Sequence, residues 1–150
     1  MVTMQEILPS KFIDLAQELM REHQKESGEE FTDIPSPQIE MYKSLEKMGW
    51  VIALGVFDDD IMIGYAIAIL SQHLHYSFLY AHHDVLFLKK KYRGRVGLKL
   101  ISEIEKKAAE RGACYIFWHA KPDSIMGKIL LKTGCKIEEI VYRKGLKCLH

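Results

Sequence analysis

The sequence predicts an α/β fold with a mixed, mostly antiparallel central sheet flanked by helices, and three observations support this fold class. Two apolar runs meet at an acidic turn, which predicts an antiparallel hairpin. An apolar strand is followed by an amphipathic helix and a second apolar strand, which predicts a parallel β-α-β crossover. Neither hairpin run alternates between apolar and polar residues, so we expect both faces of the sheet to be covered.

The N-terminal segment predicts one strand and one helix. Residues 2–8, "VTMQEIL", alternate enough to form a first strand. Pro9 and Ser10 then predict a stop and a helix N-cap. Residues 11–27 follow with apolar side chains at helical spacing and charged residues between them, which predicts the first helix.

A loop and a second helix come next. Residues 27–37 contain a glycine, two prolines and several acidic residues, which is typical of a loop. Ser36 and Pro37 suit the N-cap and the first position of a helix over residues 37–48. Gly49 is predicted to end that helix.

The middle of the chain predicts three strands. Residues 50–57 and 61–70 are the two apolar runs of the hairpin, and the acidic residues 58–60 form its turn. Residues 71–77 are predicted as a loop or a strand extension, and residues 78–88 as the third strand.

The C-terminal part predicts two further helices and two or three strands. Residues 97–112 form the clearest amphipathic helix, with Gly112 at its C-terminal end. Residues 113–120 predict a buried strand and residues 121–134 a fourth helix. Residues 135–147 predict a final strand or pair of strands.

Length and charge exclude several classes of protein. A chain of 150 residues predicts a single domain over residues 1–150, and a net charge of +1 argues against a nucleic-acid-binding polycation. Three widely spaced cysteines, Cys114, Cys135 and Cys148, argue against a disulfide framework and favour reduced thiols in a cytoplasmic protein. The N-terminus does not read as a signal peptide, and the longest apolar run falls short of the roughly 20 residues of a membrane span. No histidine or cysteine spacing predicts a metal site.

Positive charge gathers where the third strand meets the amphipathic helix, in "FLKKKYRGRVGLKLI". A helix N-terminus has unpaired amides and a positive dipole end, and glycines let a ligand approach the backbone. Such a turn predicts an anion site best matched to phosphate. The alternative is a solvated basic turn before a surface helix.

The segment "HDVLFLKKKYRGRVGLKLISEIEKKA" resembles motif A of the GCN5-related N-acetyltransferase (GNAT) superfamily. In that motif a strand leads through an Arg/Gln-x-x-Gly-x-Gly/Ala loop into a helix. "IMIGYAIAIL" resembles the hairpin before the motif, and "ILLKTGCKIEEIVYRK" resembles the closing segment. The resemblance covers roughly residues 50–146, and "YRGRVGLKLI" is also similar to small acetyltransferase-like proteins of bacteriophages.

The resemblance implies a GNAT-like fold with two splayed strands and acetyl-CoA as the acyl donor. The amides of residues 95–99 would point at the pyrophosphate, and the backbone of Phe87 and Leu88 would pair with the pantetheine arm. The residues implied in coenzyme binding are Phe87, Leu88, Lys89, Arg93, Gly94, Arg95, Val96, Gly97, Leu98 and Lys99.

The loop departs from the family pattern by one glycine. Arg95 or Val96 stands where a glycine is expected, depending on the alignment. An L-residue with positive φ costs about 1 kcal/mol or more, so we expect an adapted loop in which Gly94 carries the unusual dihedral.

Two residues on the third strand are the candidates for a catalytic base. By the resemblance, base positions lie four and six residues before the pantetheine-pairing residue Leu88, at Asp84 and His82. Strand alternation would place residues 82, 84, 86 and 88 on one face. The alternative is a structural hydrogen-bond cluster of His82, His83 and Asp84 at a strand bulge.

The general acid and the acceptor are less defined. Many members of the family have a tyrosine as general acid at the position that Leu130 occupies here. Tyr115, Tyr142 or water could then act as the acid. The missing tyrosine also favours the alternative function, a catalytically weak acyl-CoA-binding or protein-interaction module. Acidic residues within 26–40 would attract a cationic amine or basic peptide, unless that segment is only a solvated loop. The superfamily's tendency to pair or exchange its last strand leaves a homodimer open.

Overall fold

A five-stranded mixed sheet organises the first of two units into which the computed structural model divides, residues 1–117 and the part from Trp118 onward. The structure describes residues 1–27 and 37–146. The strands, in spatial order, are β1 (Val2–Glu6), β2 (Val51–Asp58), β3 (Ile61–Gln72), β4 (Leu79–Leu88) and β5 (Ala113–Phe117). The first three junctions are antiparallel and the β4–β5 junction is parallel, so the predicted hairpin and crossover are confirmed.

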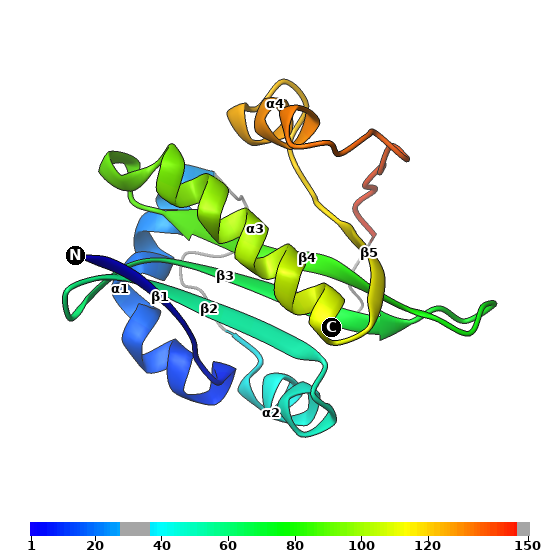
Figure 1. Ribbon diagram of the computed structural model, residues 1–150, viewed down its shortest axis with the longest axis horizontal. Helices are drawn as coiled ribbons and strands as arrows, with labels where there is room; N and C mark the ends of the chain where they lie inside the picture. Colours follow the sequence, from blue (N-terminus) through cyan, green and yellow to red (C-terminus); the bar gives the residue numbers. More distant parts are fainter. Residues whose placement is uncertain (28–36, 147–150) are drawn as a thin grey trace. The chain divides into compact units, whose positions relative to one another are not determined.

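Helices cover both faces of this sheet, as the continuous apolar runs predict (Figure 1). Helices α1 (Pro9–Ser27) and α2 (Ile39–Met48) lie on one face, and α3 (Arg95–Glu110) lies on the other. A single 3-10 turn, η1 (Lys90–Tyr92), precedes α3.

Strand alternation divides the core between the two faces. On the α1 side, Tyr65 and Phe87 pack with Phe12 and Leu19 of the first helix. On the α3 side, the fully buried residues include Ile52, Leu54, Leu70, Leu100 and Ile104. The two hairpin strands, β2 and β3, therefore contribute apolar side chains to both faces, which explains the absence of polar alternation in their sequence.

The N-terminal boundaries differ from the sequence prediction by about two residues. The first strand ends at Glu6 rather than at residue 8, although the Ile7 amide still bonds to the Ala53 carbonyl at 2.9 Å. Helix α1 begins at Pro9 itself, because proline is pre-organised for a first helical turn and has no amide to leave unpaired. Ser10 is then inside the helix and does not serve as its N-cap.

Helix α2 begins later than predicted and ends where predicted. Its N-cap is Gln38, one residue after Pro37, and the expected N-cap Ser36 lies outside the described residues. Gly49 adopts a left-handed conformation with φ of 69° and donates to the carbonyls of Glu46 and Leu45, which confirms it as the stop.

The second unit contains helix α4 (Ile125–Lys132), which confirms the predicted fourth helix. Ser124 caps it by accepting a hydrogen bond from the Gly127 amide at 3.1 Å. Residues 135–146 contain no strand, so the predicted final strand is wrong within the described chain. The apolar residues Ile137, Ile140 and Val141 of this segment are exposed, and none of the five strands of the described sheet pairs with it.

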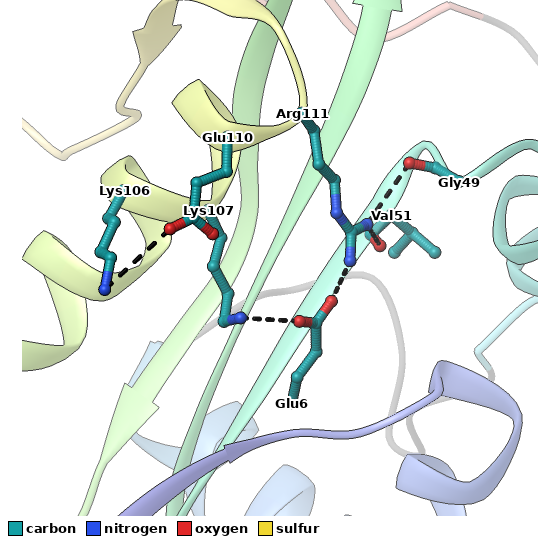
Figure 2. A network of polar contacts seen from close by, with 7 residues as sticks. All are labelled: Glu6, Gly49, Val51, Lys106, Lys107, Glu110 and Arg111. Carbon is teal, nitrogen blue, oxygen red and sulfur yellow. Dashed lines mark hydrogen bonds and ion pairs between the residues drawn. The ribbon is translucent and has the colours of Figure 1, made fainter.

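A charged cluster ties the C-terminal end of α3 to β1 and β2 (Figure 2). The Glu6 carboxylate accepts from Lys107 at 2.8 Å and also from Arg111. Arg111 further donates to the backbone carbonyls of Gly49, at 3.3 Å, and of Val51. The hydrogen bond from Lys107 to Glu6 raises the pKa of the lysine, so one carboxylate stabilises a cationic lysine beside an arginine.

Replacing Glu6→Gln should lower the free energy of unfolding by about 1 kcal/mol, because two cations lose their shared counter-charge. Urea unfolding at neutral pH measures the change. Glu110→Gln is the matched control, since the ion pair of Glu110 in the described chain is a long, exposed one with Lys106 at 4.0 Å. We expect that variant to stay within about 0.5 kcal/mol of wild type. Equal losses in both variants would show that Glu6 has no special role.

Candidate active site

The turn between β4 and α3 is built around one left-handed glycine. Gly94 has φ of 95° and ψ of −121°, which confirms that it carries the unusual dihedral of the adapted loop. Helix α3 then begins at Arg95, two residues earlier than predicted. Val96 and Gly97 therefore lie in the first helical turn, and Gly97 has no positive φ.

Three amides at the start of α3 are available to a ligand. The amides of Arg95, Val96 and Gly97 have no acceptor within residues 1–27 and 37–146. The Leu98 amide bonds to the Gly94 carbonyl at 3.0 Å, and from this residue onward α3 uses its amides internally. The predicted amide set of residues 95–99 thus narrows to the first three residues, where the helix dipole also favours an anion.

The cations of the turn divide into two groups. Arg93 is committed to the protein, because its guanidinium pairs with Glu26 at 2.7 Å and donates to the Leu88 carbonyl at 2.8 Å. Lys89 pairs with Glu22 of α1 at 3.2 Å. Lys89 and Arg93 thus each have an acidic partner in this structure, and their role at a phosphate stays a prediction.

The second group of cations is exposed and faces solvent. One further cation, Lys91, is also exposed, but its ammonium lies over the Tyr92 ring at 4.6 Å from the centroid. The group consists of Lys90, Arg95 and Lys99, none of which forms an ion pair in the described part of the chain. These three residues are close in sequence to the three unpaired amides. They supply positive charge where the helix already favours an anion.

In the described part of the chain, no strand pairs with the C-terminal half of β4 on the side opposite β3, and we call this side its open edge. Strand β5 pairs with β4 only from Leu79 to His82, whereas β3 pairs with it along its whole length. The Lys89 amide donates to the Ile63 carbonyl of β3, so alternation turns the backbone groups of Leu86 and Leu88 toward the open edge. The backbone of Phe87 faces β3, which corrects its predicted role in pairing with a ligand.

Asp84 occupies a β-bulge in β4. The ladder matches Val85 with Ile67 but His83 with Ala68, which leaves Asp84 as the extra residue. The side chain of Asp84 meets α2, and His82 lies opposite Ile69, so both are on the α1–α2 face.

The bulge changes the alternation of the strand beyond it. The predicted common face therefore holds for residues 82 and 84 and is wrong for residues 86 and 88. Leu88 lies on the α3 face, since a Cβ on Gly97 would be 3.8 Å from its side chain. The bulge itself agrees with the structural alternative that the sequence left open.

Two polar contacts in this region were not predicted from the sequence. The Tyr42 hydroxyl of α2 donates to Asp84 Oδ2 at 2.6 Å. His23 Nδ1 of α1 lies 3.0 Å from the hydroxyl of Tyr65, and its ring stacks on Phe87 with centroids 5.0 Å apart. Tyr42 lies on the apolar stripe of its helix, and a half-buried tyrosine needs a hydrogen-bond partner, so this signal was available in the sequence.

The predicted acidic segment is partly neutralised. Glu26 pairs with Arg93, and this hydrogen bond lowers the pKa of the carboxyl group. Glu40 pairs with Lys43 at 2.8 Å. The other acidic residues of the segment, Glu29, Glu30 and Asp33, lie outside the described residues.

The candidates for a general acid lie in different parts of the fold. Tyr115 is on β5, where its ring packs with Tyr80 and Phe117. Leu130, at the family's tyrosine position, is buried in the second unit, and Tyr142 of the same unit is exposed.

The described residues contain no group of histidine, cysteine and acidic side chains that could hold a metal ion. Nor does any described helix have the length and apolarity to cross a bilayer.

Comparison with known proteins identifies the family. Residues 13–125, more than half of the chain, match the model of the acetyltransferase (GNAT) family. The chain therefore belongs to the GNAT acetyltransferase family, and its mixed sheet with flanking helices is the fold of that family. No curated protein matches the chain.

Solved structures agree with the fold at low sequence identity. A ribosomal-protein-alanine N-acetyltransferase from Brucella melitensis superposes with a TM-score of 0.74 and 16% identity, over 97% of this chain and 99% of that chain. A putative acetyl transferase from Pyrococcus furiosus gives 0.72 and 20%, over 97% and 100%. An aminoglycoside acetyltransferase from an uncultured soil metagenomic sample, in complex with sisomicin, gives 0.72 and 13%, over 97% of both chains.

The two glycines of the turn should respond oppositely to alanine. Gly94→Ala places a Cβ on a residue with φ of 95°, so we expect a loss of about 1–3 kcal/mol in unfolding free energy. Gly97→Ala replaces a helical glycine at a position where the new Cβ meets only ordinary contact, so we expect a gain of about 0.5–1 kcal/mol. Thermal or urea unfolding measures both. Destabilisation of similar size in the two variants would contradict this description of the turn.

Proposed function

We propose that the protein transfers the acetyl group of acetyl-CoA to a primary amine by direct attack in a ternary complex. The family supplies the class of reaction, and the described residues support the donor and the chemistry. The observation that carries the proposal is the continuity of the open β4 edge with the start of α3, across the turn from Leu88 to Arg95.

The donor set of this region fits a coenzyme A thioester. Three unpaired amides at Arg95, Val96 and Gly97, together with exposed cations, suit a pyrophosphate. The outward backbone groups of Leu86 and Leu88 suit the amides of a pantetheine arm, which would pair with β4 as an added strand. The Leu88 carbonyl already accepts from Arg93, so Leu86 offers the unoccupied pair of backbone groups.

The reaction needs a base, because an ammonium has no lone pair with which to attack. The base takes one proton from the ammonium, and the neutral nitrogen forms a bond to the thioester carbonyl carbon. The carbon–sulfur bond then breaks, coenzyme A leaves as a thiolate, and a second proton from the nitrogen brings the thiolate to the thiol. The products are the acetamide and free coenzyme A, and no covalent enzyme intermediate is required.

His82 and Asp84 are our candidates for the base. Both lie on the α1–α2 face of β4, within the six residues that precede Leu88. Histidine has the side-chain pKa best suited to proton transfer near neutral pH, and a carboxylate can act directly or through water.

The second candidate function is an acyl-CoA-binding or interaction module of the same fold with little catalysis. The buried Leu130 at the family's tyrosine position favours it. The bond from Tyr42 to Asp84 also fits a purely structural bulge.

For the acceptor, we favour a cationic amine; a structural neighbour solved with sisomicin supports that class. A cytoplasmic location, a homodimer and the bacteriophage resemblance stay predictions.

Coenzyme binding should depend on the exposed cations of the α3 N-terminus. Arg95→Gln and Lys99→Gln should each weaken acetyl-CoA binding roughly fivefold, about 1 kcal/mol, with a smaller effect at high salt. Titration calorimetry measures the affinity. Lys106→Gln is the control, because Lys106 lies in the same helix and pairs with Glu110 near its far end. A wild-type protein that does not bind acetyl-CoA would refute both candidate functions.

Thiol release from acetyl-CoA with a panel of amines separates the enzyme from the module. For the enzyme, His82→Ala or Asp84→Asn should lower kcat by about 10²-fold or more, the usual contribution of a general base. The affinity for acetyl-CoA should change little, since neither side chain belongs to the phosphate site. Binding without turnover, unchanged by both substitutions, would favour the module.

A further inference from the structure

Asp84 is held by a contact from a helix rather than by its own strand. Its neighbours His83 and Val85 each face a residue of β3, but the bulge leaves Asp84 without a counterpart in the ladder. The side chain is also exposed, so packing does not select its rotamer. The hydrogen bond from the Tyr42 hydroxyl to Oδ2, at 2.6 Å, is the contact that fixes it.

Tyr42 is in turn firmly placed. Its ring is half-buried and packs against the core cluster between α1 and the sheet. Helix α2 is tied to α1 by Glu46, which accepts from the Ser10 amide at 2.6 Å and from the Ser10 hydroxyl at 3.2 Å. Gly49 closes the helix with its left-handed cap. The hydroxyl that reaches Asp84 therefore belongs to a ring with little freedom of its own.

The chemistry of this pair is asymmetric. Burial, with a further contribution from the bond to Asp84, raises the pKa of the Tyr42 phenol well above its ordinary value, so the tyrosine stays a donor. Asp84 has no cationic partner among the described residues, and its second oxygen, Oδ1, forms no hydrogen bond or ion pair with them. The phenol thus orients the carboxylate through one oxygen and leaves the other for a proton or an ammonium.

We propose that Tyr42 is a positioning residue for the acetyl transfer, and that its hydroxyl orients the Asp84 carboxylate so that Oδ1 receives the proton of the acceptor ammonium. This inference rests on the proposed function and assigns Asp84 as the base. In the step that it describes, one nitrogen–hydrogen bond breaks and one oxygen–hydrogen bond forms at Asp84. The freed lone pair then attacks the thioester carbon, as above. Tyr42 keeps its proton throughout and touches no reacting atom.

The chain offers a matched control for the removal of this hydroxyl. Tyr92 donates to Asp58 Oδ2, also at 2.6 Å, which is a second phenol–carboxylate bond of the same length between η1 and the end of β2. Tyr42→Phe and Tyr92→Phe therefore delete the same group from the same kind of bond. Only the first of these bonds involves the candidate base.

The experiment compares Tyr42→Phe, Tyr92→Phe, Asp84→Asn and the double variant Y42F/D84N. Steady-state kinetics with acetyl-CoA and the best amine of the panel give kcat and KM. We expect Tyr42→Phe to lower kcat on the order of tenfold with KM for acetyl-CoA within about twofold of wild type, because orientation of the base is lost while donor binding is kept. Tyr92→Phe should keep the wild-type kcat, because its hydroxyl bonds to Asp58 and not to a candidate base; since η1 lies in the turn of the proposed coenzyme site, any effect of this variant should fall on the KM for acetyl-CoA. In the Asp84→Asn background, removal of the Tyr42 hydroxyl should have no further effect.

A second readout does not depend on turnover. NMR three-bond couplings about the Cα–Cβ bond of Asp84 report whether its side chain occupies one rotamer. One rotamer is expected in wild type and Tyr92→Phe, and averaging over several rotamers in Tyr42→Phe.

The outcomes separate the two proposals. If wild type turns over and the kcat of Tyr42→Phe is no lower than that of Tyr92→Phe, the positioning role is overturned and the proposed function stands. The positioning role is also overturned if the reductions in kcat caused by Tyr42→Phe and by Asp84→Asn multiply in the double variant. A third outcome is that wild type binds the coenzyme but shows no turnover, while the couplings still distinguish Tyr42→Phe from Tyr92→Phe. This result overturns the catalytic function, but the contact between Tyr42 and Asp84 stands.

Discussion

The one-sided pairing of β4 is the constraint on which the rest of the structure depends. Strand β3 holds β4 along its whole length, so the position of β4 is fixed. Strand β5 leaves β4 after His82, so within residues 1–27 and 37–146 no strand pairs with the other edge where the chain turns into α3. A close approach supports this arrangement: a Cβ on Gly64 would lie 2.8 Å from the Phe87 carbonyl oxygen, so β3 comes this near to the end of β4 only with a glycine there. The open edge follows from that placement, and it ends where the chain enters α3, whose first amides are unpaired in the described part of the chain as at any helix start.

Most of the fold could be predicted from the sequence because the informative signals were local. Apolar runs without alternation indicate strands covered on both faces, and the helix before Gly112 is strongly amphipathic; the structure confirms both. The final strand could not be judged in this way. Residues 135–146 carry apolar side chains suited to burial, yet a strand exists only where another strand pairs with it, and pairing is not a local property.

The candidate site was predictable in place but not in detail. Gly94 could be chosen as the left-handed residue because the turn needs one positive φ and only a glycine accepts it at low cost. The ion pair between Arg93 and Glu26 joins residues 67 positions apart, and no local sequence pattern predicts such a contact. The bulge at Asp84 had the largest effect, since one extra residue reverses the face of every side chain beyond it. The tyrosine that holds Asp84 comes from a helix 42 residues away in sequence.

The main-chain amides at the start of α3 have a practical consequence for work on this protein. Amides of this kind recognise negative charge and oxygen geometry rather than a particular molecule. Under the proposed function, inorganic phosphate and sulfate therefore compete with the pyrophosphate of the coenzyme for Arg95, Val96 and Gly97. Apparent affinities will be weaker in phosphate buffer or ammonium sulfate than in a chloride buffer of equal ionic strength. The fraction of the site that is occupied by coenzyme thus depends on which anion the buffer contains.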